Sequence, residues 1–198
     1  MPDAPNALDR PIILNITGEK VALGPHRRDL LPLYQRWIND FSIRVNLGGR
    51  VGPMTWEAEE AWYEGIAKAS GSVHFTIYER ATLRPIGTTA LHDVDHFHRT
   101  AEFGLMIGER DCWGRGYGTE TARLMLEHGF TNLNLHNIGL RVFSTNARAL
   151  GAYARAGFQE CGRRRECLRP GGTVCDEIFM ECLATGFDGP AETAPSAL

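Results

Sequence analysis

The stretch "WGRGYGTETARLMLEHGF", residues 113–130, decides how this chain is organised. Its glycines, Gly114, Gly116 and Gly118, stand at alternate positions, and apolar residues at helical spacing follow at once. Glycine lets a backbone turn tightly and approach a ligand closely. The first N–H groups of a helix have no partner within it, and the helix dipole favours an anion there. The stretch therefore predicts a phosphate-binding turn over residues 114–119, with Arg115 adding positive charge.

The common nucleotide motifs do not fit this turn. The dinucleotide pattern G-x-G-x-x-G needs a different spacing of its third glycine, and no Gly-Lys-Ser/Thr of a nucleotide P-loop occurs in the chain. Taken alone, the motif is explained equally well by a glycine turn that binds nothing.

Alternating and helical patterns on either side of this turn predict a mixed fold. Helical spacing predicts helices, and alternation predicts strands. Residues 41–55, with several glycines and a proline, are expected to form a loop. The strand, helix and strand from 102 to 143 should form a right-handed parallel unit. The fold class is therefore α/β or α+β. Helices are expected at 28–40, 55–70, 118–133 and 146–158, and strands at 20–25, 72–80, 86–94, 100–108 and 138–145, with a closing hairpin at 159–183.

Composition and charge exclude several classes of protein. The 198 residues have a net charge of −3, which gives no basic field for nucleic acid. No apolar run is long enough to span a membrane, and the N-terminus lacks the features of a signal peptide, so a cytoplasmic location is the expectation. The five cysteines lack zinc-site spacing. Free thiols are expected, although a hairpin would allow Cys167 to pair with Cys175, or Cys161 with Cys182.

A second motif follows the turn. The segment "NARALGAYARAGF" carries Asn146, Ala149, Tyr153, Gly157 and Phe158 at the spacing N-x-x-A-x-x-x-Y-x-x-x-G-F. With the glycine turn it resembles the GNAT superfamily of acyl-CoA-dependent N-acyltransferases. "WGRGYGTETA", "RWINDFSIRVNLG" and "EEAWYE" resemble its RimJ/RimL-like branch. Trp113 stands where Gln or Arg is usual in the superfamily, and Ala149 where Ser is frequent.

The resemblance implies a mostly antiparallel sheet of about seven strands with helices on both faces, in one acyltransferase domain over residues 1–184. The Gly-, Pro- and Ala-rich tail, 185–198, is expected to be disordered. The cosubstrate would be acetyl-CoA, with no metal. Backbone amides of a splayed strand would bind its pantetheine arm, and the glycine turn its pyrophosphate. The cofactor-binding residues implied are Leu105, Met106, Ile107, Trp113, Gly114, Arg115, Gly116, Tyr117, Gly118, Thr119, Asn146 and Ala149.

The resemblance makes Tyr153 the general acid, because a phenol is a suitable proton donor to a departing thiolate. Glu102, which begins the strand 100–108, resembles the position of a general base in some relatives, and an exposed carboxylate at a strand end is an equal alternative. His92, Asp93 and Glu109 are weaker candidates for the base. The histidines of "HDVDHFH" invite a metal interpretation, but a solvated turn is the stronger one.

Several aromatic residues lie in the segments that resemble the acceptor side of the family. Most are expected in the core, with one or two lining an amine pocket. They are Trp37, Phe41, Trp56, Trp62 and Tyr63.

The function implied is acetyl transfer from acetyl-CoA to a primary amine, with a protein N-terminus as the first candidate. A small-molecule amine, such as a polyamine, amino sugar or aminoglycoside, is the alternative. A non-catalytic acyl-CoA-binding module is a third interpretation, against which the intact Tyr153 argues. Homodimers are frequent among similar proteins, which makes a homodimer an expectation by analogy.

Overall fold

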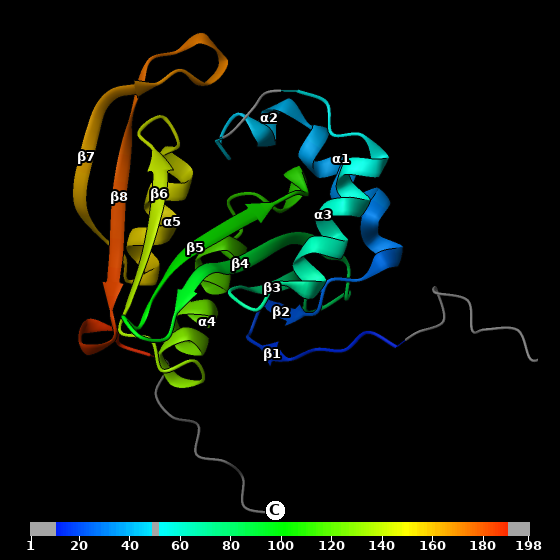
Figure 1. The fold of residues 1–198 in the computed structure, drawn as a ribbon, viewed down its shortest axis with the longest axis horizontal. Helices are drawn as coiled ribbons and strands as arrows, with labels where there is room; N and C mark the ends of the chain where they lie inside the picture. The colour runs from blue at the N-terminus through cyan, green and yellow to red at the C-terminus, as the bar shows by residue number, and fades with distance from the viewer. Residues whose placement is uncertain (1–10, 49–51, 190–198) are drawn as a thin grey trace, which may run out of the picture.

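A computed structural model describes residues 11–48 and 52–189 and shows one twisted sheet with helices on both faces (Figure 1). The sheet has eight strands in the order β1-β2-β3-β4-β5-β6-β8-β7. The strands are β1 (Ile16–Thr17), β2 (Val21–Gly24), β3 (Val73–Glu79), β4 (Pro85–Asp95), β5 (Thr100–Ile107), β6 (Asn137–Phe143), β7 (Gln159–Leu168) and β8 (Cys175–Leu183). The helices are α1 (Leu31–Asn39), α2 (Phe41–Arg44), α3 (Trp56–Lys68), α4 (Tyr117–Thr131) and α5 (Ala147–Ala156).

Every neighbouring pair of strands is antiparallel except β5 and β6. These two are parallel, as the strand–helix–strand pattern predicts, with α4 as the crossover. Their pairing covers only Thr100 to Glu102 on β5 and Asn137 to Gly139 on β6. Beyond these residues the strands diverge, although β5 continues to Ile107 and β6 to Phe143. The divergence opens a gap in the middle of the sheet (Figure 1).

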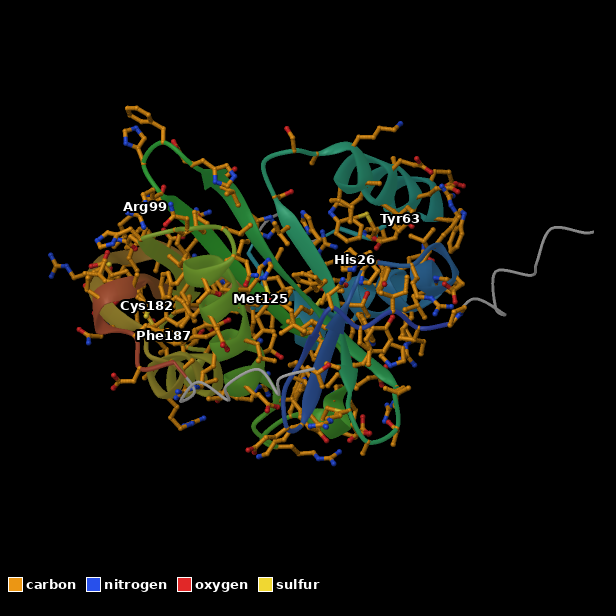
Figure 2. The ribbon with its side chains drawn as sticks, turned by 90° about the horizontal axis from the view of Figure 1, so that it is seen from below. His26, Tyr63, Arg99, Met125, Cys182 and Phe187 are labelled. Atoms are coloured by element: carbon orange, nitrogen blue, oxygen red, sulfur yellow. The ribbon has the colours of Figure 1, made fainter. Side chains whose placement is uncertain are left out.

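The two faces of the sheet carry separate helical layers (Figure 1). On one face, α4 and α5 pack over the main core, in which Met125, Leu126 and Phe103 are buried. On the other face, α1 contributes a smaller cluster that includes Tyr34 and Trp37. The two clusters lie on opposite faces because neighbouring side chains of a strand point to opposite sides of the sheet. Figure 2 shows Met125 on the α4 side, and His26 and Tyr63 on the side of α1 and α3.

The fold class is as predicted, and two local details differ from the sequence expectations. The short β1 adds an eighth strand by pairing with β2. Part of the expected loop 41–55 forms α2, because the Asp40 carboxylate accepts the Ser42 N–H at 2.8 Å and caps the helix. All five cysteines are free thiols, as the sequence favours.

The tail also departs from its prediction. Disorder was expected from residue 185, yet Ala184–Gly186 form a 3-10 turn. The Phe187 ring then packs against Phe130, with ring centroids 5.4 Å apart. Partial burial of this aromatic side chain stabilises the segment, although the residues around it are small or polar. Residues 190–198 lie outside the described part, so disorder there stays a prediction.

Candidate active site

The glycine turn has the backbone that its sequence predicts. Gly114 and Gly116 adopt φ values of 74° and 87°, in the left-handed region that favours glycine. A Cβ on Gly114 would meet no described atom within 4 Å, so the turn is open where a ligand would approach. The third glycine, Gly118, lies inside α4, and a Cβ there would contact the Leu105 side chain at 3.4 Å. The alternate glycines thus serve two turn positions and one close approach of α4 to β5.

The first turn of α4 presents unpaired donors. The first hydrogen bond of the helix runs from the Glu120 N–H to the Gly116 carbonyl at 3.1 Å. Within the described ranges, the N–H groups of Tyr117, Gly118 and Thr119 have no hydrogen-bond partner. The residues therefore fit a phosphate group, which would accept these N–H groups at the positive end of the helix dipole.

A lysine that sequence reasoning missed completes this anion site. The Lys20 ammonium lies 3.2 Å from the position of a Cβ on Gly116. The Glu120 carboxylate holds it there, since its oxygens accept the N–H groups of Glu19, Lys20 and Val21 at 2.6, 2.8 and 3.0 Å. Glu120 thereby attaches the β1–β2 turn to the start of α4. No local pattern signals this contact, because the partners stand about 100 residues apart.

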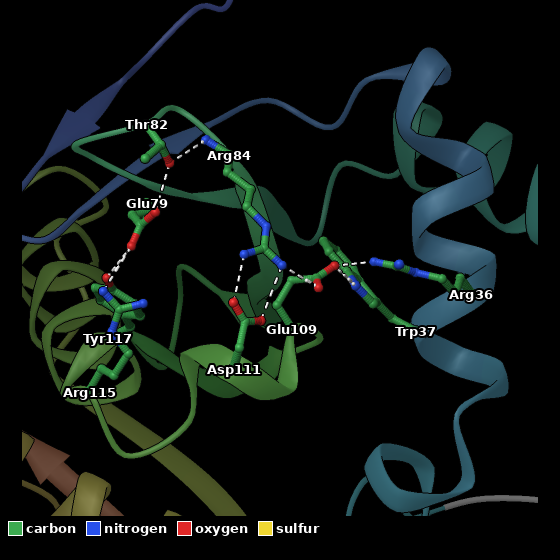
Figure 3. Close-up of polar contacts among 9 residues, drawn as sticks. All are labelled: Arg36, Trp37, Glu79, Thr82, Arg84, Glu109, Asp111, Arg115 and Tyr117. Carbon is green, nitrogen blue, oxygen red and sulfur yellow. Dashed lines mark hydrogen bonds and ion pairs between the residues drawn. The ribbon is translucent and has the colours of Figure 1, made fainter.

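Arg115 and Tyr117 point toward Glu79 at the end of β3 (Figure 3). The Tyr117 hydroxyl donates a hydrogen bond to the Glu79 carboxylate, and the Arg115 guanidinium lies 3.2 Å from the same oxygen. These hydrogen bonds and charges hold the pKa of Glu79 below its usual range. Tyr117 is a buried core residue, and the Arg115 guanidinium also lies over its ring. Phosphate binding by Arg115 stays a prediction, and it would compete with Glu79.

Glu109 anchors α1 to the segment before the glycine turn (Figure 3). Its carboxylate accepts the Trp37 indole N–H at 2.8 Å and pairs with Arg84 at 2.6 Å. Arg36 pairs with the same carboxylate. The Trp37 ring lies against Gly108, where a Cβ would come within 2.2 Å of the ring. Glu109 therefore has a structural role, and its role as a base stays a prediction.

The diverging part of β5 presents backbone groups to the gap. The Gly108 N–H donates to the Ile86 carbonyl on β4 at 2.8 Å, and the Ile107 carbonyl accepts the Trp113 indole N–H at 2.9 Å on the other side. Strand alternation then directs the backbone of Leu105 and Ile107 toward the gap and that of Met106 toward β4. Met106 is therefore a poor candidate for a backbone contact to a ligand, and its side chain packs against the α1 cluster.

Trp113 is fixed between β5 and α5. Besides its bond to Ile107, its ring lies under the Arg148 guanidinium, whose central carbon is 3.7 Å from the ring centroid. Burial lowers the pKa of Arg148. These two contacts hold the Trp113 ring beside the glycine turn, at the position where Gln or Arg is usual in the superfamily.

Tyr153 stands on α5, whose start carries a side-chain cap. The Asn146 side chain accepts the Ala149 N–H at 3.2 Å, so Asn146 is the N-cap. Tyr153 is only 8% exposed, and its ring packs edge-on against Phe103 at 5.9 Å. Its hydroxyl has no hydrogen-bond partner among the residues described. Burial raises its pKa to about 12, so the phenol keeps its proton at neutral pH.

Glu102 lies on the opposite face of β5 from Phe103, because the two are consecutive. Its carboxylate accepts the Arg141 guanidinium at 2.8 Å, and its side chain is 37% exposed. This ion pair occupies one of the two carboxylate oxygens. The general-base role of Glu102 is compatible with this position and stays a prediction.

A single cavity of about 780 Å³ joins these residues. Its walls include every predicted cofactor-binding residue, together with Tyr153 and Glu102. The cavity then continues beneath α1 and α3. There its walls include His26, Tyr34, Ile38, Ile43, Met54, Glu59, Trp62, His74 and His92.

Of the aromatic residues predicted near the acceptor side, Trp62 lines the cavity. Trp37 is buried in the core, and Tyr63 packs against the α1 cluster. Phe41 and Trp56 are exposed. The expectation that most of these residues would be buried is therefore only partly met.

Neutral imidazoles line the same part of the cavity. His26 bonds through Nδ1 to the Thr76 hydroxyl at 2.9 Å, and its ring lies 5.9 Å from that of His74. His74 lies 5.1 Å from His92. Burial lowers the pKa of His26 to about 3 and that of His74 to about 4, and each is lowered further by a neighbouring imidazole. At neutral pH these two rings therefore add no positive charge to the cavity.

In residues 11–48 and 52–189, no group of three or more His, Cys, Asp and Glu side chains has a geometry for a metal ion. Asp95 of the histidine-rich turn instead accepts the N–H groups of Phe97 and His98, both at 2.8 Å. In the same ranges, no helix is long and apolar enough to cross a membrane.

Comparison with known proteins places this geometry in a family. A family model described as an acetyltransferase (GNAT) domain matches residues 21–159. The spermidine N(1)-acetyltransferase of Vibrio cholerae is 35% identical over 111 residues, which are 56% of this chain and 64% of that protein. The uncharacterized N-acetyltransferase p20 of Bacillus licheniformis is 29% identical over 115 residues, 58% of this chain and 64% of that protein. The match thus spans less than two thirds of either relative.

A solved structure is similar over a larger share of the chain. The crystal structure of spermidine N-acetyltransferase from Vibrio cholerae in complex with CoA and spermine has a TM-score of 0.77 and 25% identity. The similarity covers 85% of this chain and 98% of that one. With its diverging parallel strands, glycine turn and matching family model, this chain belongs to the GNAT acetyltransferase family.

Proposed function

We propose that the protein transfers an acetyl group from acetyl-CoA to a primary amine of a small cationic molecule. The observation that carries this proposal is the continuous cavity. It runs from the donors at the start of α4, past Tyr153, to a wall beneath α3. Such a cavity holds two substrates at once, as direct transfer between them requires.

Acetyl-CoA supplies a thioester, whose carbonyl is the electrophile. The N–H groups of Tyr117 to Thr119 and the Lys20 ammonium would hold its pyrophosphate. A backbone N–H of Leu105 or Ile107 would polarise the carbonyl. Tyr153 would donate its hydroxyl proton to the departing thiolate, which then leaves as the free thiol.

The amine must lose a proton before or during attack, and Glu102 is the proposed base, acting through water. We expect Glu102→Gln to flatten the acidic limb of the pH–rate profile, because an amide does not accept a proton there. Stopped assays of kcat/KM from pH 6 to pH 9 measure this limb. A limb that matches the wild type would discard Glu102 as the base. The weaker candidates His92, Asp93 and Glu109 would then remain.

Two observations favour a small molecule over a protein N-terminus. The acceptor part of the cavity lies beneath α1 and α3 and contains a buried carboxylate, Glu59. Several similar proteins are named spermidine N-acetyltransferases. The cytoplasmic location, the single domain and the homodimer stay predictions.

The test is release of free thiol from acetyl-CoA by the purified protein. The acceptors are spermidine, putrescine, an aminoglycoside and a set of peptides with different N-terminal residues. We expect release with the polyamines and not with the peptides. Release with peptides alone would establish a protein acceptor instead. Binding of acetyl-CoA with no release in any sample would favour the non-catalytic module.

A further inference from the structure

Glu59 is a buried carboxylate with no partner. It lies in the first turns of α3, is 5% exposed and lines the cavity. In the ranges 11–48 and 52–189 its side chain forms no hydrogen bond or ion pair. Acidic side chains are rarely buried unless they are paired, because loss of hydration penalises the charge. Burial accordingly raises the pKa of Glu59.

Arg28, a positive side chain that contacts α3, is paired with carboxylates other than Glu59. The Arg28 guanidinium pairs with Glu60 at 2.7 Å and also with Glu64, two exposed residues of the same helix. His26 and His74 are neutral at neutral pH. Within residues 11–48 and 52–189, no positively charged side chain pairs with the Glu59 carboxylate in the acceptor part of the cavity.

An aromatic ring lies beside this carboxylate. Trp62 is three residues after Glu59 on α3, so the two side chains share one face of the helix. The Trp62 ring lies 5.6 Å from that of His26 and 6.4 Å from that of His74. Trp62 is 39% exposed, and an indole face attracts a cation.

We propose that Glu59 binds a second, non-reacting ammonium group of the acceptor, beside the Trp62 ring. The reacting amine must be neutral when it attacks, and a carboxylate beside it would favour its charged form. Glu59 also belongs to α3, across the cavity from α5, which carries Tyr153 (Figure 1). The acceptor is therefore a diamine or polyamine that spans the cavity, an inference that rests on the proposed function.

Putrescine and butylamine test the proposal, because they share a carbon chain and differ in the second amine. We expect the wild type to acetylate putrescine with a lower KM than butylamine. Glu59→Gln should raise the KM for putrescine at least tenfold. The KM for butylamine, the KM for acetyl-CoA and kcat should stay unchanged. The KM of Glu59→Asp for putrescine should lie between those of the wild type and Glu59→Gln. Glu57→Gln, at an exposed position two residues before Glu59 and so on another face of α3, should behave like the wild type.

A binding measurement separates this proposal from the proposed function. Calorimetric titration of putrescine into wild type and Glu59→Gln needs no turnover. Weaker binding to the variant with no acetylation by either protein would support the cation site and overturn the transferase. Acetylation of putrescine with equal KM and equal affinity in both proteins would overturn the cation site alone. The melting temperature of Glu59→Gln should equal or exceed that of the wild type, because the amide removes a buried, unpaired charge.

Discussion

At the scale of single residues, Tyr153 carries the proposed proton transfer. Its hydroxyl lies on the cavity wall, and burial raises its pKa to about 12. We expect Tyr153→Phe to lower kcat by about a hundredfold or more, which is typical for loss of a general acid. The acetyl-CoA dissociation constant should stay within twofold, because the ring still packs against Phe103. Equal turnover by both proteins would remove the acid role.

Protonation of His26, which lines the acceptor part of the cavity, should make the stability of the protein depend on pH. Its pKa is about 3 in the folded protein and about 6.5 in the unfolded chain, so the unfolded state binds more protons between these values. The contribution of the neutral His26 ring to the free energy of unfolding is present at pH 7 and is lost as the pH falls below about 6.5. From pH 7 to pH 5 this loss amounts to about 2 kcal/mol.

We therefore expect His26→Gln to lose less stability than the wild type over that interval. Urea unfolding at pH 7 and at pH 5 gives the two free energies of unfolding for each protein. Parallel losses in both proteins would show that His26 is already solvated in the folded state.

At the scale of elements, the contact between α4 and the β1–β2 turn shapes the anion site. The Glu120 carboxylate accepts three backbone N–H groups and so positions Lys20 over Gly116. Glu120→Ala should lower the free energy of unfolding by about 2–3 kcal/mol, since bonds to a charged acceptor are lost. It should also weaken CoA binding, because Lys20 loses its support. Glu127→Ala, two turns further along α4, is the control for urea unfolding and for CoA titration, and neither value should change.

At the scale of the whole molecule, the segment after β8 closes the core beneath α4 and α5. Phe187 packs on Phe130, and its ring lies 3.6 Å from the position of a Cβ on Gly157. Phe187→Ala should lower the melting temperature by several degrees while kcat is unchanged, because aromatic burial is lost far from the cavity. Phe97→Ala is the matched control, since Phe97 is 89% exposed. Equal melting temperatures for the two variants would contradict a packing role for the segment.

The features predicted from the sequence are local in the chain. The turn at Gly114 and Gly116, the helix over residues 146–158 and the place of Tyr153 on it each depend on residues a few positions apart. Backbone geometry and helix capping act over that range, so spacing alone reveals them.

The features that were missed depend on contacts between distant segments. Lys20 reaches the glycine turn through Glu120, about 100 residues away. Glu59 looks like any charge at the start of a helix until α3 is packed over the sheet. The same limit applies to Met106, since the edge of β5 that faces the gap follows from pairing with β4. Sequence patterns give residue types, whereas their surroundings come from the tertiary fold.

The gap between β5 and β6 also bears on how such proteins change their substrates. The anion site lies at the start of α4, which packs on one face of the sheet, while α1 and α3 cover the cavity from the other. Substitutions in α1 and α3 can therefore alter the choice of acceptor without changing the residues at the start of α4 that would bind the acyl donor. Selection can act on the two halves separately. This independence gives a physical reason why a chain with 25% identity to a spermidine N-acetyltransferase keeps the same framework.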